Sequence, residues 1–161
     1  MNGSEQTNTD DAQQRWAGLM DQTVAETFSA MLGLGCTPSQ AADAQLPAAS
    51  LRKISARIEF SGAMQGSCAV AMSNADALKI AEIFLAGTAD DAMAADTVGE
   101  LCNVLAGSWK RRLKPPASGA GLSVPAITHD DDAPASNVRQ TYSCDGAQLV
   151  VRLIVQKMQE E

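Results

Sequence analysis

A helical segment occurs twice in this chain of 161 residues. Residues 22–33 read QTVAETFSAMLG and residues 96–107 read DTVGELCNVLAG, so a Thr-Val pair, a glutamate and a closing glycine coincide in the alignment. Each copy is followed by a loop and then by strand-like segments. A duplicated unit of this kind predicts a domain with an internal pseudo-twofold repeat. Chance agreement between two alanine-rich amphipathic helices is the competing explanation.

The spacing of apolar residues predicts an α+β fold, in which long amphipathic helices cover one side of an antiparallel sheet. Apolar residues at helical spacing predict helices over residues 11–33, 74–87 and 91–113, and alternating residues predict strands over 53–62, 67–73, 122–128, 138–144 and 147–156. Residues 36–50 are rich in proline, alanine and serine and are expected to form a loop. We expect residues 1–10 to be a flexible polar leader and 11–161 to be one domain, built from degenerate repeats over about 11–87 and 88–158.

The composition excludes several classes of protein. A formal net charge of -7, with no basic stripe, argues against a protein that binds nucleic acid through its phosphates. The basic cluster over residues 110–114 lies where a helix should end, which favours an interaction with the negative helix terminus over an anion site. No segment approaches the roughly 20 apolar residues of a membrane span. We therefore expect a cytoplasmic protein that binds neither nucleic acid nor membrane.

Four cysteines are widely spaced, without a Cys-x-x-Cys pair: Cys36, Cys68, Cys102 and Cys144. In a cytoplasmic protein this pattern predicts four reduced and mostly buried thiols.

Polar residues of the second copy share one face of their helix. They recur at steps of four, three, four and three residues, namely Asp96, Glu100, Asn103, Gly107 and Lys110. Such a row is ordinarily the solvated side of an amphipathic helix. The first copy keeps the glutamate, as Glu26, but has Ser29 where the second copy has the asparagine. A hydroxyl cannot present a donor and an acceptor on a planar amide, so if this face is chemically active, the first copy is a degenerate site.

The motif resembles that of the CheC/CheX/FliY family of chemotaxis phosphatases, and most closely the single-site CheX type. The family motif is Asp or Ser, three residues, Glu, two residues, Asn, and a proline some twenty residues later. This pattern matches Asp96, Glu100, Asn103 and Pro125. The resemblance covers about residues 20–156 and implies a CheC-like fold, a phosphatase acting on a phosphorylated CheY-type response regulator, and a homodimer formed through the sheets. It also implies that Asn103 orients the attacking water and that Glu100 pairs with an active-site lysine of the regulator.

The chemistry of these residue types agrees with that implication. An acyl phosphate is already reactive, and the regulator is expected to bring its own Mg²⁺, so the chain needs no cofactor of its own. A carboxamide can hold a water in line because it donates and accepts together. Asp96 and Lys110 are expected to help bind the partner, although Asp96 could equally be a charge favoured by the helix dipole. Gly107 is expected to leave room for the partner's backbone, whereas Gly99 is assigned no role.

Two other interpretations of the function remain open. The same helix face could bind a response regulator or another signalling protein without catalysis, or the domain could be a structural subunit that keeps the fold. His129 and the acidic run over residues 130–132 could suggest a metal site, but one histidine in an acidic loop favours a solvated loop. No metal site is therefore expected.

Overall fold

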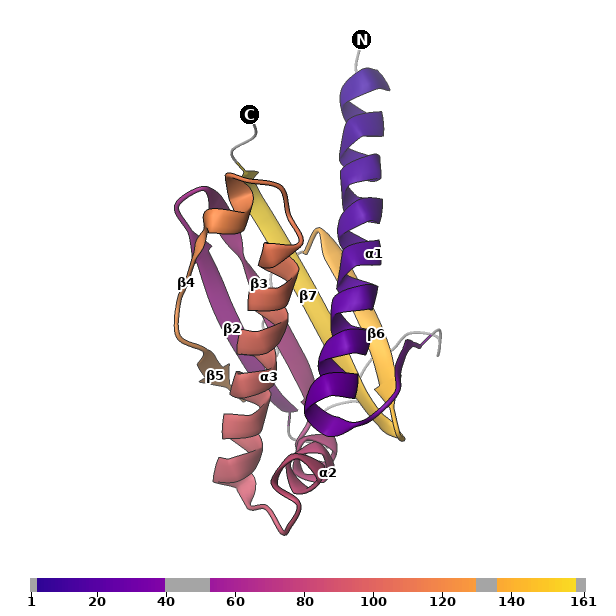
Figure 1. Cartoon of the computed structure of the whole chain (residues 1–161), viewed down its shortest axis with the longest axis vertical. Coiled ribbons are helices and arrows are strands. Elements are labelled where there is room, and N and C mark those ends of the chain that lie inside the picture. Colours follow the sequence, from indigo (N-terminus) through magenta and orange to yellow (C-terminus); the bar gives the residue numbers. More distant parts are fainter. Residues whose placement is uncertain (1–2, 40–52, 130–135, 159–161) are drawn as a thin grey trace.

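The computed structural model describes residues 3–39, 53–129 and 136–158. A seven-stranded sheet whose strand pairs are all antiparallel carries two long helices on one face, as the periodicity predicts (Figure 1). The helices are α1 (Gly3–Leu32), α2 (Asn74–Leu85) and α3 (Asp91–Arg111), with a short 3₁₀ turn at Ala117–Gly119. The strands are β1 (Cys36–Pro38), β2 (Lys53–Ser61), β3 (Met64–Ser73), β4 (Gly121–Leu122), β5 (Ala126–Thr128), β6 (Val138–Cys144) and β7 (Ala147–Met158).

The strand order has the twofold symmetry that the repeated helix predicts. The order is β1-β6-β7-β3-β2-β4, and β5 also pairs with β2. The strands β3 and β7 lie together at the centre, each beside its own hairpin partner, and each outermost strand pairs with the hairpin of the other half. Exchanging the two halves of the chain therefore leaves the order unchanged. The helices α1 and α3 run side by side in opposite directions, as this symmetry requires (Figure 1).

Both central hairpins form where turn residues predict them. Asp145 and Gly146 connect β6 to β7 with φ values of 49° and 85°, the left-handed conformation that an Asp-Gly turn supplies. The turn from β2 to β3 is shorter than expected, because β3 begins at Met64 rather than at residue 67. Gly66 lies inside β3 at a break in register, where a Cβ atom would collide with the Ile154 carbonyl of β7. A glycine in a strand at such a close approach is a packing requirement.

The core fills the space between the sheet and the two long helices. Buried side chains of α1 and α3 face alternate residues of β2, β3 and β7. Among the largest of them is Trp109, whose ring centroid lies 5.8 Å from that of Phe60 on β2. This packing fixes α3 on the sheet, so its opposite face is presented by a rigid element.

Three boundaries differ from the sequence-based expectation. The helix predicted from residue 11 begins earlier, at Gly3, so α1 extends through most of the residues expected to form a leader. No proline interrupts the residues between Gly3 and the predicted start, so nothing in this segment blocks the helix. The predicted loop over residues 36–50 contains β1 at its start, and residues 40–50 lie outside the described part. The predicted strand over 122–128 is two short edge strands, β4 and β5, with Pro125 between them.

The prediction of four reduced thiols is wrong for two of them. Cys36 of β1 and Cys144 of β6 lie opposite each other in the ladder, with their Cα atoms 4.4 Å apart, and form a disulfide. Cys68 and Cys102 are free and buried. The bond links residues 108 positions apart in the sequence, so only the pairing of β1 with β6 brings the two thiols together.

Among the helices of the described residues, none combines the length and the apolar character that crossing a bilayer requires.

Candidate functional site

The predicted polar face of α3 is exposed along three of its five residues. Asp96, Glu100 and Asn103 are exposed, whereas the other side of the helix is buried in the core. We refer to these three residues as the acidic stripe. The helix begins where expected, because the Asp90 carboxylate accepts a hydrogen bond from the Met93 N–H.

Glu100 and Asn103 lie one turn apart on α3, and both side chains are exposed. Within the described residues, neither side chain makes a hydrogen bond or an ion pair. An exposed carboxylate and carboxamide on a rigid helix can therefore both engage a group that approaches from outside. This arrangement offers recognition of a cation and orientation of a water molecule.

Gly99 has a role that the sequence did not reveal. A Cβ atom at this position would lie 3.3 Å from Ile127 Cδ1 and 3.6 Å from Pro125 Cβ. The glycine therefore lets the segment around β5 lie close against α3. Gly99 stands four residues before Asn103 on the same side of the helix, and that spacing was the only signal in the sequence.

Gly107 and Lys110 were also expected to face a partner, but both make contacts within the chain. Gly107 is buried, and a Cβ atom there would lie 3.8 Å from Leu122 Cδ1 and from a guanidinium nitrogen of Arg111. The expected open gap is therefore absent, because the chain's own side chains cover it. The Lys110 ammonium donates a 2.8 Å hydrogen bond to the Ala120 carbonyl and so ties the segment after α3 to the helix.

The equivalent residues of the first copy lie on α1. Glu26 and Ser29 are both exposed, as their counterparts on α3 are. Unlike Glu100, however, the Glu26 carboxylate forms an ion pair with Arg112, just beyond α3. The first copy thus lacks the carboxamide and has its carboxylate already engaged.

Comparison with known proteins shows the family to which the chain belongs. The family model of the chemotaxis phosphatase CheX matches residues 54–145. The chain belongs to this family. No curated protein matches the chain in sequence.

Solved structures of similar fold include members of the CheX family. A chain of the CheX–CheY–BeF₃–Mg²⁺ complex from Borrelia burgdorferi shares 18% identity at a TM-score of 0.65, over 88% of this chain and 98% of that one. CheX from Vibrio vulnificus shares 18% identity at a TM-score of 0.68, over 88% and 96%. FliY from Thermotoga maritima is more distant, with 15% identity and a TM-score of 0.56, over 86% and 84%. These likenesses confirm the CheC-like fold.

The cysteine beside Asn103 is not a nucleophile of this CheX-family site. Cys102 points into the core, where its thiol lies 3.4 Å from the Ala56 carbonyl and 3.5 Å from the Cys68 carbonyl, as a hydrogen-bond donor to both. A hydrogen bond with the Cys68 thiol, and then burial, raise the pKa of Cys102 well above its usual value. The thiol therefore stays protonated at neutral pH.

Metal-ligating residues do not gather in the part of the chain that the structure describes, where no group of three or more His, Cys, Asp or Glu side chains could hold an ion. His129 is exposed at the end of β5. The acidic run that follows it, residues 130–132, lies outside the described residues.

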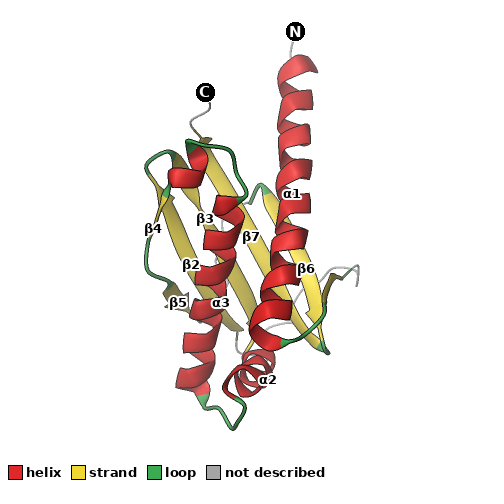
Figure 2. Cartoon of the chain, viewed as in Figure 1, coloured by secondary structure: helices red, strands yellow, loops and turns green. Residues whose placement is uncertain are grey.

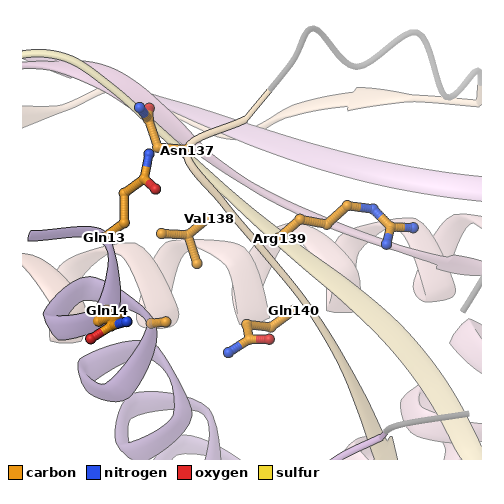
Figure 3. A pocket seen from close by; sticks show the side chains of 7 residues that line it. Gln13, Gln14, Asn137, Val138, Arg139 and Gln140 are labelled. Carbon is orange, nitrogen blue, oxygen red and sulfur yellow. The ribbon is translucent and has the colours of Figure 1, made fainter. Parts of the chain in front are cut away.

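A hollow of about 330 Å³ lies between α1 and β6, away from the stripe (Figure 3). Its lining is mainly amide side chains, and Gln13 points toward Asn137 across it. The lining residues are Gln13, Gln14, Ala17, Asn137, Val138, Arg139 and Gln140. No carboxylate, thiol or hydroxyl lines it, so it offers no group for acid–base or nucleophilic chemistry.

Proposed function

We infer that this chain is a phosphatase that hydrolyses the aspartyl phosphate of a CheY-type response regulator in chemotaxis or a related two-component pathway. One observation carries the inference. A chain of the CheX phosphatase family presents Glu100 and Asn103 side by side on a rigid helix, exposed and without a partner among the described residues. A similar fold occurs in a CheX–CheY complex from Borrelia burgdorferi.

In this proposal the two residues have separate tasks. The Asn103 carboxamide holds a water molecule in line with the scissile bond, donating through its NH₂ and accepting through its oxygen. The water attacks phosphorus, the bond from phosphorus to the aspartyl oxygen breaks, and inorganic phosphate and the free carboxylate result. Asn103 positions the water and is not a base. The Mg²⁺ of the regulator offsets the charge on the transferring group.

Glu100 fixes the register of the two proteins. Its carboxylate pairs with a lysine of the regulator's active site through a charge-assisted bond, which is partly desolvated on docking. Asp96, one turn earlier on the same stripe, adds negative charge that attracts the same lysine. The active site is thus divided between two proteins.

The test is the release of phosphate from phosphorylated CheY-type regulators, with the wild-type protein and with Asn103→Ala. We expect the wild-type protein to accelerate release and the variant to lose this acceleration while it still binds. Ser29→Ala, at the matching position of the first copy, is the control and should keep full activity. Binding without acceleration by the wild-type protein would instead favour a docking module.

We further propose that the protein forms a homodimer through the edges of its sheet. The outermost strand β1 pairs on one side only within the described residues, and its unpaired backbone groups invite a second copy. Light scattering coupled to size exclusion would decide between one and two copies. A monomer at micromolar concentration would refute this part of the proposal.

A further inference from the structure

An apolar side chain stands out on the surface beside α3. Val124, between β4 and β5, is 83% exposed, more than any other large apolar residue in the described part of the chain. Single exposed apolar residues are common on loops and need no explanation. The surroundings of Val124 distinguish it from such a residue.

The backbone on both sides of Val124 is fixed to β2. The Ser123 N–H donates to the Glu59 carbonyl at 3.0 Å, and the Glu59 N–H donates to Ser123 Oγ at 2.9 Å. On the other side, Ala126 begins β5 and pairs with Arg57. The side chain is therefore held at one place on the surface, and little conformational entropy is lost when a partner covers it.

The same segment places Val124 level with Asn103. Leu122 lies against Gly107, whereas Pro125 and Ile127 lie against Gly99, so the segment runs along α3 in the opposite direction. Figure 2 shows this connection beside the helix. Eight residues of helix span about 12 Å, and three steps of extended chain span about 10 Å. Val124 thus falls level with the turn of α3 that carries Asn103.

We propose that Val124 docks against an apolar patch that borders the phosphorylated aspartate on the receiver domain of the response regulator. The proposal rests on the proposed function for the identity of this partner. The acidic stripe supplies charge and orientation, but the attraction between charges weakens as salt is added. Burial of the valine contributes affinity that salt does not screen, and it removes bulk water from the side of the site beside Asn103.

A second copy of this chain fits the surface less well. A twofold contact through this face would bring Asp96 and Glu100 of one copy toward the same carboxylates of the other. Like charges brought together at an interface oppose association. A partner with a lysine at its active site instead offers a cation with which Glu100 can pair.

The experiment measures the Kd for a CheY-type regulator activated with BeF₃⁻ and Mg²⁺, by calorimetry, at 150 mM salt. Val124→Ser removes the apolar surface at an exposed position, so the variant keeps its fold, which a melting curve checks. Leu85→Ser is the matched control, because Leu85 is also exposed, at 46%, but lies at the end of α2. Val124→Leu keeps the apolar character at the same place.

We expect Val124→Ser to raise the Kd about tenfold, while Val124→Leu and Leu85→Ser stay within about twofold of the wild type. An unchanged Kd for Val124→Ser, or an equal loss for Leu85→Ser, would overturn the proposal, as would a wild-type protein that does not bind. A wild-type protein that binds without releasing phosphate would refute the proposed function alone, because the Kd values still test the docking of Val124.

Discussion

Two glycines in α3 differ in what a methyl group would meet. At Gly107 the nearest side-chain atoms would be 3.8 Å from a new Cβ, an ordinary contact, whereas at Gly99 Ile127 Cδ1 would be only 3.3 Å away. Alanine gains about 1 kcal/mol over glycine inside a helix. We therefore expect Gly107→Ala to raise the free energy of unfolding by about 0.5–1 kcal/mol, and Gly99→Ala to give no gain. Urea denaturation measures both.

The same pair of variants also tests the expected gap on the helix. Because Gly107 is covered by the chain's own side chains, Gly107→Ala should keep the full rate of phosphate release. A variant that is well folded but inactive would restore the prediction that a partner's backbone approaches at this position. Equal stabilisation by the two variants would mean that Pro125 and Ile127 do not press on the helix.

Glu100→Gln should weaken binding of the regulator without changing the geometry of the stripe. The amide keeps the length of the side chain but removes the charge, and a hydrogen bond to a charged group contributes about 1.5–3 kcal/mol. We expect the Kd for the activated regulator to rise by one to two orders of magnitude, and the difference from the wild type to shrink as salt is added. Calorimetry at two salt concentrations measures it.

Asp96→Asn is the control for this change, because it removes the same charge one turn away. A loss as large as that of Glu100→Gln would show that the total negative charge matters and not a specific pair. Such a result would contradict the proposal that Glu100 fixes the register of the two proteins.

At the scale of elements, α1 is held to the sheet by a polar contact. Tyr142 of β6 donates a 2.7 Å hydrogen bond from its hydroxyl to Asp21 of α1, and the Gln140 amide donates to the same oxygen at 3.3 Å. Burial, and then this hydrogen bond, raise the pKa of the Tyr142 phenol. The folded protein therefore holds this proton more tightly than the unfolded chain does.

The contribution of Tyr142 to the free energy of unfolding should therefore decrease as the pH rises. It is fully present below the phenol's unfolded pKa of about 10, and it is lost progressively as the pH rises above that value, because the unfolded chain then releases the proton first. Urea denaturation between pH 8 and 11 should show this loss for the wild type and a flatter profile for Tyr142→Phe. Parallel profiles for the two proteins would contradict the assignment.

Local patterns in the sequence located the elements that are long or bounded by turn residues. The helix α3 and the hairpin around Asp145 formed as expected, because their signals lie within a few residues. The strand β1 is three residues long and exists through its pairing with β6, more than a hundred positions away, so neither it nor its disulfide could be anticipated. The motif pointed to Glu100 and Asn103 because its residues lie within one helix. The close packing at Gly99 and the position of Val124 could not be predicted, because they depend on a segment that folds back along α3.

At the scale of the whole molecule, the twofold arrangement is not matched by two equal sites. The helix α1 occupies the position that α3 occupies in the other half, yet Glu26 is paired with Arg112, while Glu100 has no ion-pair partner in the described part of the chain. The residue equivalent to Arg112 in the first half is Pro38, which carries no charge to engage Glu100. The difference between the two halves therefore lies in the surroundings of the glutamate as well as in the missing asparagine.

An asparagine introduced at position 29 of α1 should not by itself create a second active site. In an Asn103→Ala background, we expect Ser29→Asn to leave phosphate release at the level of the regulator alone, because the Arg112 guanidinium still engages the carboxylate that would register the partner. Adding Arg112→Ala frees Glu26, and the triple variant should then bind the activated regulator more tightly than the double variant does, by about 0.5–1 kcal/mol for an exposed pair. Phosphate release and calorimetry on the same preparations measure the two effects. Activity in the double variant would show that Ser29 is the only defect of the first copy, and that the ion pair opens readily when a regulator docks.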